Sequence, residues 1–130
     1  MLARGATLQY IELEAELCGF IGRANYTGEA GSDVRAAAWV EAKGKVDTKL
    51  RRVVANLGDK KFLCGGDSPT GADYAVATIT WLMSQRSLWP EVRAEQPALD
   101  AHFGRVVAAA PGAAACFEEM SAWEPYYKRT

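Results

Sequence analysis

The sequence predicts an all-α protein, a bundle of about five helices, and three observations lead to this prediction. Apolar residues recur at helical spacing in five separate segments of the 130-residue chain. No segment alternates apolar and polar residues with the period of two that a half-buried strand shows. One segment, residues 71–83, is apolar on nearly every side, which is typical of a helix that runs through the middle of a bundle. The length suits a single domain, so residues 1–130 are expected to form one helical domain.

The first two helices are predicted from long amphipathic stretches. The first is expected from about Ala6 to Ala24 and fades at the Asn25 segment, before a glycine-containing loop. Ser32 is the predicted N-cap of the second helix, which ends at Gly58. Its lysines and arginines are expected on a solvated face. The apolar stripe of the second helix consists of Trp39, Ala42, Val46, Leu50, Val53, Val54 and Leu57.

Three shorter helices follow a loop that is rich in turn-forming residues, 60–69. The third helix begins at Thr70, and Arg86 and Pro90 mark its end. The fourth begins near Pro97 and is interrupted at Pro111. The fifth, about Ala113 to Ala122, directs Phe117 and Met120 to the core, and Pro125 closes it. The apolar stripe of the fourth helix consists of Leu99, Phe103, Val106, Val107 and Ala110.

The start of the third helix carries a capping motif. The first backbone N–H groups of a helix have no partner within it, so a buried helix needs side chains that accept from them. The Thr70 hydroxyl is placed to accept from the Asp73 N–H, and the Asp73 carboxylate to accept from the Thr70 N–H, as in a short-armed capping box. Asp73 also stands at the positive end of the helix dipole. Both residues are therefore predicted to be structural, and Asp73 is not predicted to be catalytic.

Composition excludes several classes of function. Fifteen basic and sixteen acidic residues give a formal charge of −1, which argues against a nucleic-acid-binding surface. No apolar run approaches the roughly 18 residues of a membrane span, and the first residues lack the apolar centre of a signal peptide. A cytoplasmic location is therefore expected. Cys18, Cys64 and Cys116 are scattered and odd in number, so neither a disulfide framework nor a metal site is predicted.

A set of paired motifs surrounds the start of the third helix: Phe62-Leu63, Gly66-Asp67, Pro69-Thr70 and Ala72-Asp73. These motifs are similar to the helix-six signature of the glutathione transferase superfamily, and the chain resembles the C-terminal helical domain of that family. The resemblance covers essentially the whole chain. Two departures stand out: the Cys64-Gly65-Gly66 loop is one residue longer than usual, and Gly71 replaces an aliphatic residue and so removes a core contact. Further similar positions are Trp81-Leu82, Pro97-Ala98-Leu99, Phe103, Arg105 and Pro111.

The resemblance implies a transferase-type fold without the transferase's reaction centre. In the family, an N-terminal thioredoxin-like domain supplies most of the glutathione site and the residue that activates the thiol. This chain enters its first helix almost directly after Met1, and nothing in it matches the activating residue. The N-terminal domain is therefore expected to be absent, and no catalytic residue is predicted. Glutathione is expected to bind only together with a thioredoxin-like partner domain.

Other candidate residues follow from the family's helical domain, which lines the pocket for the apolar substrate. The resemblance makes aromatic residues of the first helix and the tail candidates for that lining, although core packing or plain exposure is the more common role of such residues. His102 is expected to be packed rather than to act as a general base. Cys64, on a glycine-rich loop, is predicted to be the most exposed thiol. The substrate-lining candidates are Tyr10, Phe20, Tyr26, Tyr126 and Tyr127.

Two functions remain open at this point. The first is a transferase-related domain that contributes an apolar-substrate pocket and pairs with itself, as a homodimer, or with a thioredoxin-like partner. The second is a non-catalytic assembly module, because the same helical domain occurs in the gamma subunit of translation elongation factor one and in synthetase scaffold proteins. Residues 79–105 are similar to the elongation-factor version as well. The second reading implies a partner in a translation complex.

Overall fold

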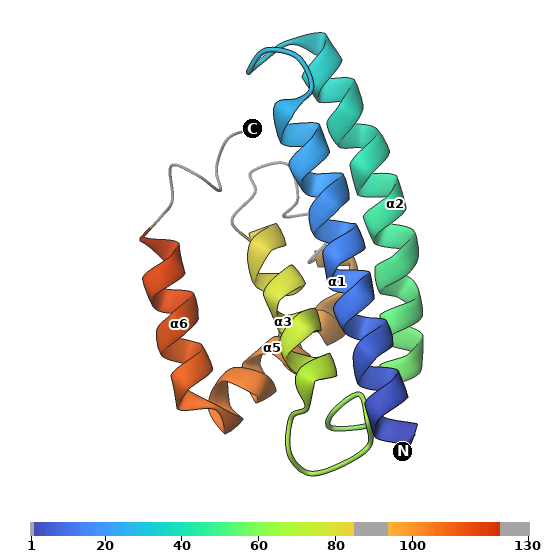
Figure 1. Cartoon of the computed structure of the whole chain (residues 1–130), viewed down its shortest axis with the longest axis vertical. Coiled ribbons are helices and arrows are strands. Elements are labelled where there is room, and N and C mark those ends of the chain that lie inside the picture. The colour runs from blue at the N-terminus through green and yellow to red at the C-terminus, as the bar shows by residue number, and fades with distance from the viewer. Residues whose placement is uncertain (1, 85–93, 123–130) are drawn as a thin grey trace.

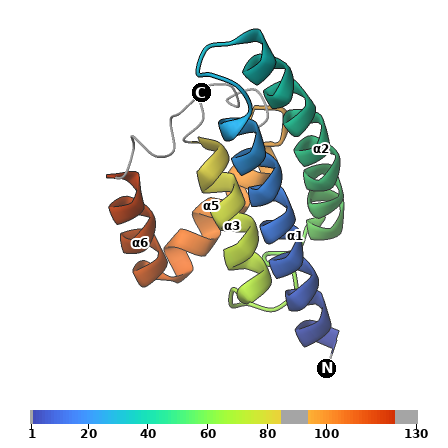
Figure 2. The same cartoon turned by 45° about the horizontal axis from the view of Figure 1, so that its top comes forward.

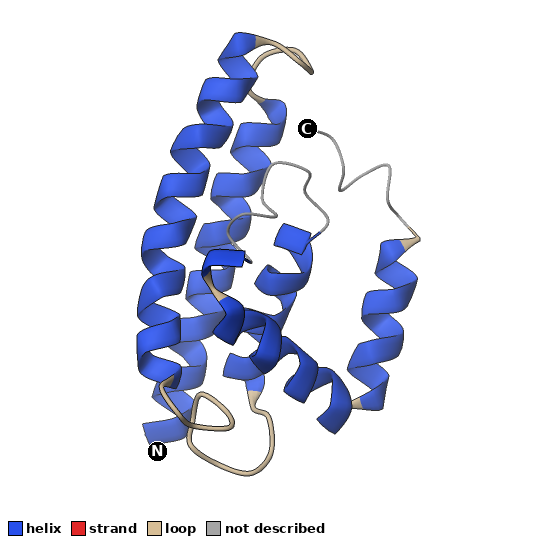
Figure 3. Cartoon of the chain, turned by 180° about the vertical axis from the view of Figure 1, so that it is seen from behind, coloured by secondary structure: helices blue, strands red, loops and turns tan. Residues whose placement is uncertain are grey.

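The computed structural model describes residues 2–84 and 94–122, and all regular secondary structure within these two ranges is helical. This confirms the all-α prediction. Figure 1 shows the two long helices side by side, with the shorter helices on one side of the pair and the last of them farthest from it. Figure 3 shows the same arrangement from behind, with helices joined only by loops. The elements are α1 (Leu2–Tyr26), α2 (Asp33–Leu57), α3 (Gly71–Ser84), α5 (Pro97–Ala109) and α6 (Pro111–Ser121).

The helix α3 lies in the middle of the molecule, between α1 and α5, as Figures 1 and 2 show. Its start lies beside Thr7 near the start of α1, and both helices rise from the same end of the molecule. Leu17 of α1 and Leu50 of α2 meet Val76 and Ile79 of α3 in the main core. The helix that is apolar on all sides is therefore the central one, as its composition predicts. Its buried residues are Ala72, Asp73, Ala75, Val76, Ala77, Ile79, Thr80, Trp81, Leu82 and Met83.

The second helix begins and ends where its sequence predicts. The Ser32 hydroxyl oxygen accepts from the Arg35 N–H at 3.2 Å and caps the helix, and Gly58 follows its last residue with a φ of 53°. That backbone conformation favours glycine, which explains why α2 stops there. The predicted stripe faces the core: Val54 is half-buried, and Trp39, Ala42, Val46, Leu50, Val53 and Leu57 are buried.

The last two helices meet at a sharp corner. Ala110 alone separates α5 from α6, and a proline opens each helix at a position where no backbone N–H is required. Pro111 therefore starts α6 two residues before the predicted start. Leu99 and Val106 of α5 are buried, whereas α6 has no buried residue, and its Phe117 and Met120 are half-buried.

Some sequence predictions lie outside the described residues, namely those on Arg86, Pro90, Pro125 and the tail tyrosines. Within the described ranges, none of the helices has the length and apolar character needed to cross a membrane.

Candidate functional site

A buried polar cluster fastens the start of α3. The Asp73 side chain is completely buried, and its Oδ1 accepts from the Leu63 N–H at 2.9 Å. Its Oδ2 accepts from the Thr70 N–H at 2.8 Å and from the Thr70 hydroxyl at 3.0 Å. The Thr70 hydroxyl oxygen also lies 3.5 Å from Cys64 Sγ. A single carboxylate thus joins the loop before α3 to the first turn of the helix.

This geometry differs from the expected capping box in one half. The Asp73 carboxylate accepts from the Thr70 N–H, as anticipated, but the Thr70 hydroxyl donates to that carboxylate. The Asp73 N–H donates to the Thr70 carbonyl oxygen at 3.0 Å. A carboxylate can only accept, so the nearby hydroxyl proton turns toward it. Charge on the acceptor also makes this hydrogen bond stronger than one to a neutral group.

His102 of α5 completes the cluster. Its ring is fully buried, and Nε2 lies 2.8 Å from Asp73 Oδ1, so Nε2 carries the proton that the carboxylate accepts. The other ring nitrogen, Nδ1, is buried with no hydrogen-bond partner among the described residues. His102 is packed, as the sequence predicts. Its hydrogen-bond partner, Asp73, lies 29 residues earlier in the chain, and no local sequence pattern predicts this bond. Because both side chains are closed to solvent, the pair cannot reach a substrate.

The hydrogen bonds decide the charge of Asp73. Burial opposes ionisation and would raise the pKa of this carboxyl. The hydrogen bonds from His102, from the Leu63 N–H and from Thr70 favour the charged form and together outweigh the burial, so the pKa of Asp73 lies below its ordinary value. The cluster is therefore an ionised carboxylate held by four donors, which is a structural arrangement.

The structure shows why glycine suits positions 65 and 71. Gly65 has a φ of 79°, and its N–H donates to the Phe62 carbonyl oxygen at 2.9 Å, so the loop closes in a tight turn at this residue. At Gly71, a side-chain Cβ would lie 2.7 Å from Thr7 Cγ2. The methyl group of α1 therefore occupies the space that an aliphatic residue would fill, and Gly71 permits the close approach of the two helices.

Tyr10 lies on a recess between α1 and α2. The recess has a volume of about 440 Å³, and Tyr10 Oη accepts from the Asn56 side-chain amide at 3.4 Å. Lys49 and Glu16 form an ion pair of 3.3 Å along the same groove. The lining mixes charged and apolar side chains, so Tyr10 lies in a more polar setting than an apolar-substrate pocket would supply.

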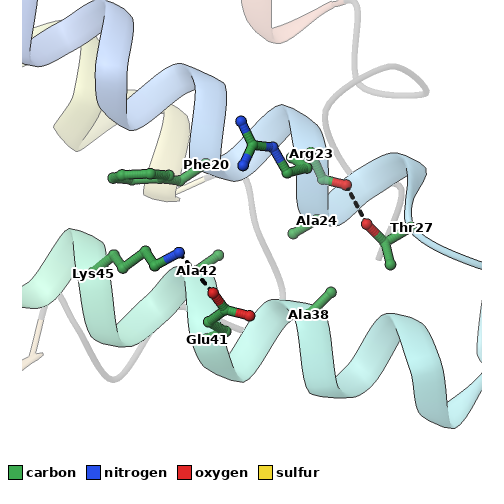
Figure 4. Close-up of a pocket in the computed structure, with 8 residues that line it drawn as sticks. All are labelled: Phe20, Arg23, Ala24, Thr27, Ala38, Glu41, Ala42 and Lys45. Atoms are coloured by element: carbon green, nitrogen blue, oxygen red, sulfur yellow. Dashed lines mark hydrogen bonds and ion pairs between the residues drawn. The ribbon is translucent and has the colours of Figure 1, made fainter.

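Phe20 lies on a second recess, of about 150 Å³, farther along the same helix pair. Figure 4 shows its ring beside Lys45, whose Nζ lies 5.2 Å from the ring centroid and 2.6 Å from Glu41 Oε1. Tyr26, at the end of α1, is 79% exposed. Tyr10 and Phe20 therefore line different recesses, and Tyr126 and Tyr127 lie outside the described residues.

A third recess is formed by aromatic side chains that the sequence analysis placed on the apolar faces of three helices. It lies between α3, α5 and α6 and has a volume of about 270 Å³. The ring of Phe117 lies 5.8 Å from that of Trp81 and 5.2 Å from that of Phe103, between centroids. Their spacing along three different helices gives no common sequence pattern, which is why only the folded chain shows them together. We call this recess the aromatic cleft.

The thiols are arranged differently from the expectation. Cys116 is exposed, whereas Cys64 is half-buried, so the prediction that Cys64 is the most exposed thiol is wrong. The loop turns Cys64 toward Thr70, which covers it. Burial, followed by the negative charge of Glu14, raises the pKa of the half-buried Cys18 thiol. Across the described ranges, no disulfide joins these cysteines, and no group of three or more histidine, cysteine, aspartate and glutamate side chains could hold a metal ion.

Comparison with known proteins gives one finding of similarity. The family model described as the C-terminal domain of glutathione S-transferase matches residues 18–110, which is well over half of the chain. The matched range contains α2, α3 and α5 and the buried cluster around Asp73, and it ends immediately before α6. No curated protein and no solved structure matches in the corresponding comparisons. The chain belongs to the glutathione S-transferase C-terminal domain family.

Proposed function

We propose that this chain is the helical part of a glutathione-transferase-type assembly, in which it supplies partner contacts and one wall of an apolar-substrate pocket. The observation that carries the proposal is an exposed apolar group at the end of the molecule where α1 and α3 begin. Leu8, Ile11 and Tyr74 are 58%, 45% and 37% exposed, respectively. Large apolar side chains that gather at one end of a domain favour contact with another protein surface.

The end patch, defined as Leu8, Ile11 and Tyr74, suits a thioredoxin-like partner or a second copy of the chain. Its position at the close approach of α1 and α3 gives a partner a rigid surface, because Gly71 lets Thr7 pack directly on the helix start. Binding there would add to buried apolar area without rearranging the core.

The substrate wall would come from α1. Tyr10 and Phe20 each line a recess along this helix, and the described residues that line the two recesses include none from α3. A partner domain that covers one of these recesses would turn it into a closed pocket. The proposed lining residues are therefore Tyr10 and Phe20, with Tyr26, Tyr126 and Tyr127 as further candidates from the resemblance.

Catalysis is proposed to need the partner. All regular secondary structure of the described residues is helical, and a thioredoxin-like partner domain would supply the glutathione site. The one buried acid–histidine pair, Asp73 and His102, is engaged in holding α3 and α5 together. A conjugation assay of this chain alone, with glutathione and a generic electrophile, should give no turnover above background. Robust glutathione-dependent turnover would overturn the proposal.

The partner contact can be tested separately by sedimentation of the wild type and two matched variants. Ile11→Asp places a charge in the end patch and should dissociate the homodimer or the complex with a thioredoxin-like partner. Val40→Asp is the control, because Val40 is 73% exposed on α2, away from the end patch. Equal effects of the two variants, or an effect of Val40→Asp alone, would refute an interface at the end patch.

A second candidate function is a non-catalytic assembly module, like the helical domains of translation elongation factor one gamma or synthetase scaffolds. It is favoured by Val40, whose side chain is 73% exposed on α2, a helix that contributes nothing to the end patch. Co-purification with translation factors that is lost in Val40→Asp would support this function. Recovery of the chain only as a free homodimer would count against it.

A further inference from the structure

The aromatic cleft between α3, α5 and α6 combines an apolar wall with a single acidic group. Its wall is formed by the half-buried rings of Phe103 and Phe117, and the buried ring of Trp81 stacks against Phe117, so aromatic side chains from three helices meet there. The Trp81 indole N–H donates to Ser121 Oγ at 3.2 Å, and the Ser121 hydroxyl donates to the Phe117 carbonyl oxygen at 2.8 Å. These two bonds fix the relative positions of α3 and α6 and hold the cleft in shape.

Glu118 introduces a negative charge into this cleft. On α6 the lining residues are Ala114, Phe117, Glu118 and Ser121, whose spacing places them on one face of the helix. The cleft runs along α6 from Ala114 to Ser121, so one end of it reaches the last turn of the helix, where the dipole presents its negative end and no basic residue lies. Among the described residues that line the cleft, none is basic.

We propose that the aromatic cleft binds a small organic cation of the alkylammonium class. Aromatic faces attract a cation through their quadrupole, and a carboxylate and a helix C-terminus beside them add to the attraction. An anion would meet Glu118 and the carbonyl end of α6, so it is disfavoured. The volume of about 270 Å³ matches a molecule of few heavy atoms, smaller than an ordinary drug-sized ligand.

This site is separate from the substrate wall and the end patch proposed above. None of its lining residues belongs to α1 or α2. Its α6 wall also lies beyond residues 18–110, the range that matches the family. The proposal therefore does not depend on transferase-type assembly, and either can fail without the other.

The test compares two probes of nearly equal shape, choline and its neutral carbon isostere 3,3-dimethylbutan-1-ol, by titration of the full chain in low salt. The readout is the chemical shift of the Trp81 indole N–H, assigned with Trp81→Phe. Choline should shift this signal saturably, and the neutral isostere should bind about fivefold more weakly or worse, because it lacks the charge. Raising the salt concentration should weaken choline binding, since the carboxylate is exposed to solvent.

Two charge-matched variants locate the site. Glu118→Gln should weaken choline binding about fivefold, because it removes the carboxylate while keeping the shape of the side chain. Glu119→Gln removes the same charge from the next residue, which is exposed and does not line the cleft, and should leave binding unchanged. Both variants should retain the wild-type fold, since both side chains are exposed.

Several outcomes would overturn the assignment. Equal affinity for the two probes would mean a merely apolar recess, and equal effects of the two variants would mean a diffuse charge effect. The absence of a saturable Trp81 shift would exclude the site. Tighter choline binding after Lys128→Gln with Arg129→Gln would identify the chain's own cationic residues as competitors, in place of an external ligand.

Discussion

The start of α3 and the helix α6 are held in place by very different means. At the start of α3, the buried Asp73 carboxylate accepts from Leu63, Thr70 and His102, and it thereby joins a loop and two helices. In contrast, α6 has no buried residue and is tied to α3 by the bond from Trp81 to Ser121 and by ring contacts. We therefore expect the stability of the fold to depend strongly on the first region and only weakly on the second.

The largest effect is expected from Asp73→Ala. This change leaves four donors without their acceptor in a closed environment, so it should lower the free energy of unfolding by about 3 kcal/mol or more, well beyond the ~1 kcal/mol of an exposed cap. Chemical denaturation measures the change. Asp67→Ala is the control on the same loop, where the side chain is exposed, and it should alter stability by less than about 0.5 kcal/mol. Similar values for the two variants would contradict the role given to the cluster.

Acid should weaken the same region by protonating the carboxylate. Because the pKa of folded Asp73 lies below its unfolded value of about 3.9, its contribution to stability is fully present above that pH. The contribution is lost as the pH falls through the lower pKa of the folded state. Unfolding measured from pH 6 to pH 2 should therefore be less steeply pH-dependent in Asp73→Asn than in the wild type. Parallel pH profiles of the two proteins would show that Asp73 is not the group responsible.

A smaller effect is expected at the contact between α1 and α3. The Gly71→Ala methyl would meet Thr7 Cγ2 at 2.7 Å, and the resulting displacement should cost about 1–2 kcal/mol. The comparison is Gly44→Ala on the exposed side of α2, where nothing lies within 4 Å of the added carbon. That variant should instead stabilise the protein by up to about 1 kcal/mol. Thermal unfolding of both variants measures these opposite changes in stability. A stabilising effect of Gly71→Ala would refute the close approach of α1 and α3.

The smallest effect is expected at α6. Ser121→Ala removes the acceptor of the Trp81 indole and should cost roughly 0.5–1 kcal/mol. Because α6 has no buried residue, the loss should appear as faster amide hydrogen exchange confined to α6, with α3 unaffected. Exchange that accelerates equally in α3 would mean that the two regions open as one unit. Ser68→Ala, on an exposed loop, serves as the reference.

Much of the fold was predictable because helical periodicity and caps are local signals. The helix α2 begins after Ser32 and ends before Gly58, and α5 begins at Pro97, as predicted. The apolar stripe of α2 faces the core, as its spacing requires. The helix α6 begins two residues before its predicted start because Pro111, which interrupts the fourth helix, also favours the first position of the next helix.

The sites were less predictable because they depend on distant residues. His102 follows Leu99 by three positions and precedes Val106 by four, so its burial has a sequence signal, but its bond to Asp73 has none. The aromatic cleft likewise needs α3, α5 and α6 to be placed first. The substrate-lining set remains a prediction, and the structure divides Tyr10 and Phe20 between two recesses because they lie ten residues apart on a straight helix.

The donors to Asp73 also imply an order of folding. Leu63 and Thr70 lie within ten residues of Asp73, so their bonds close a short loop at small entropic cost, whereas His102 must arrive with α5. We expect the loop and the first turn of α3 to be structured in the folding transition state and the histidine bond to form afterwards. Thr70→Ala should then mainly slow refolding, and His102→Leu should mainly accelerate unfolding. One carboxylate would in this way connect an early kinetic step to a late one.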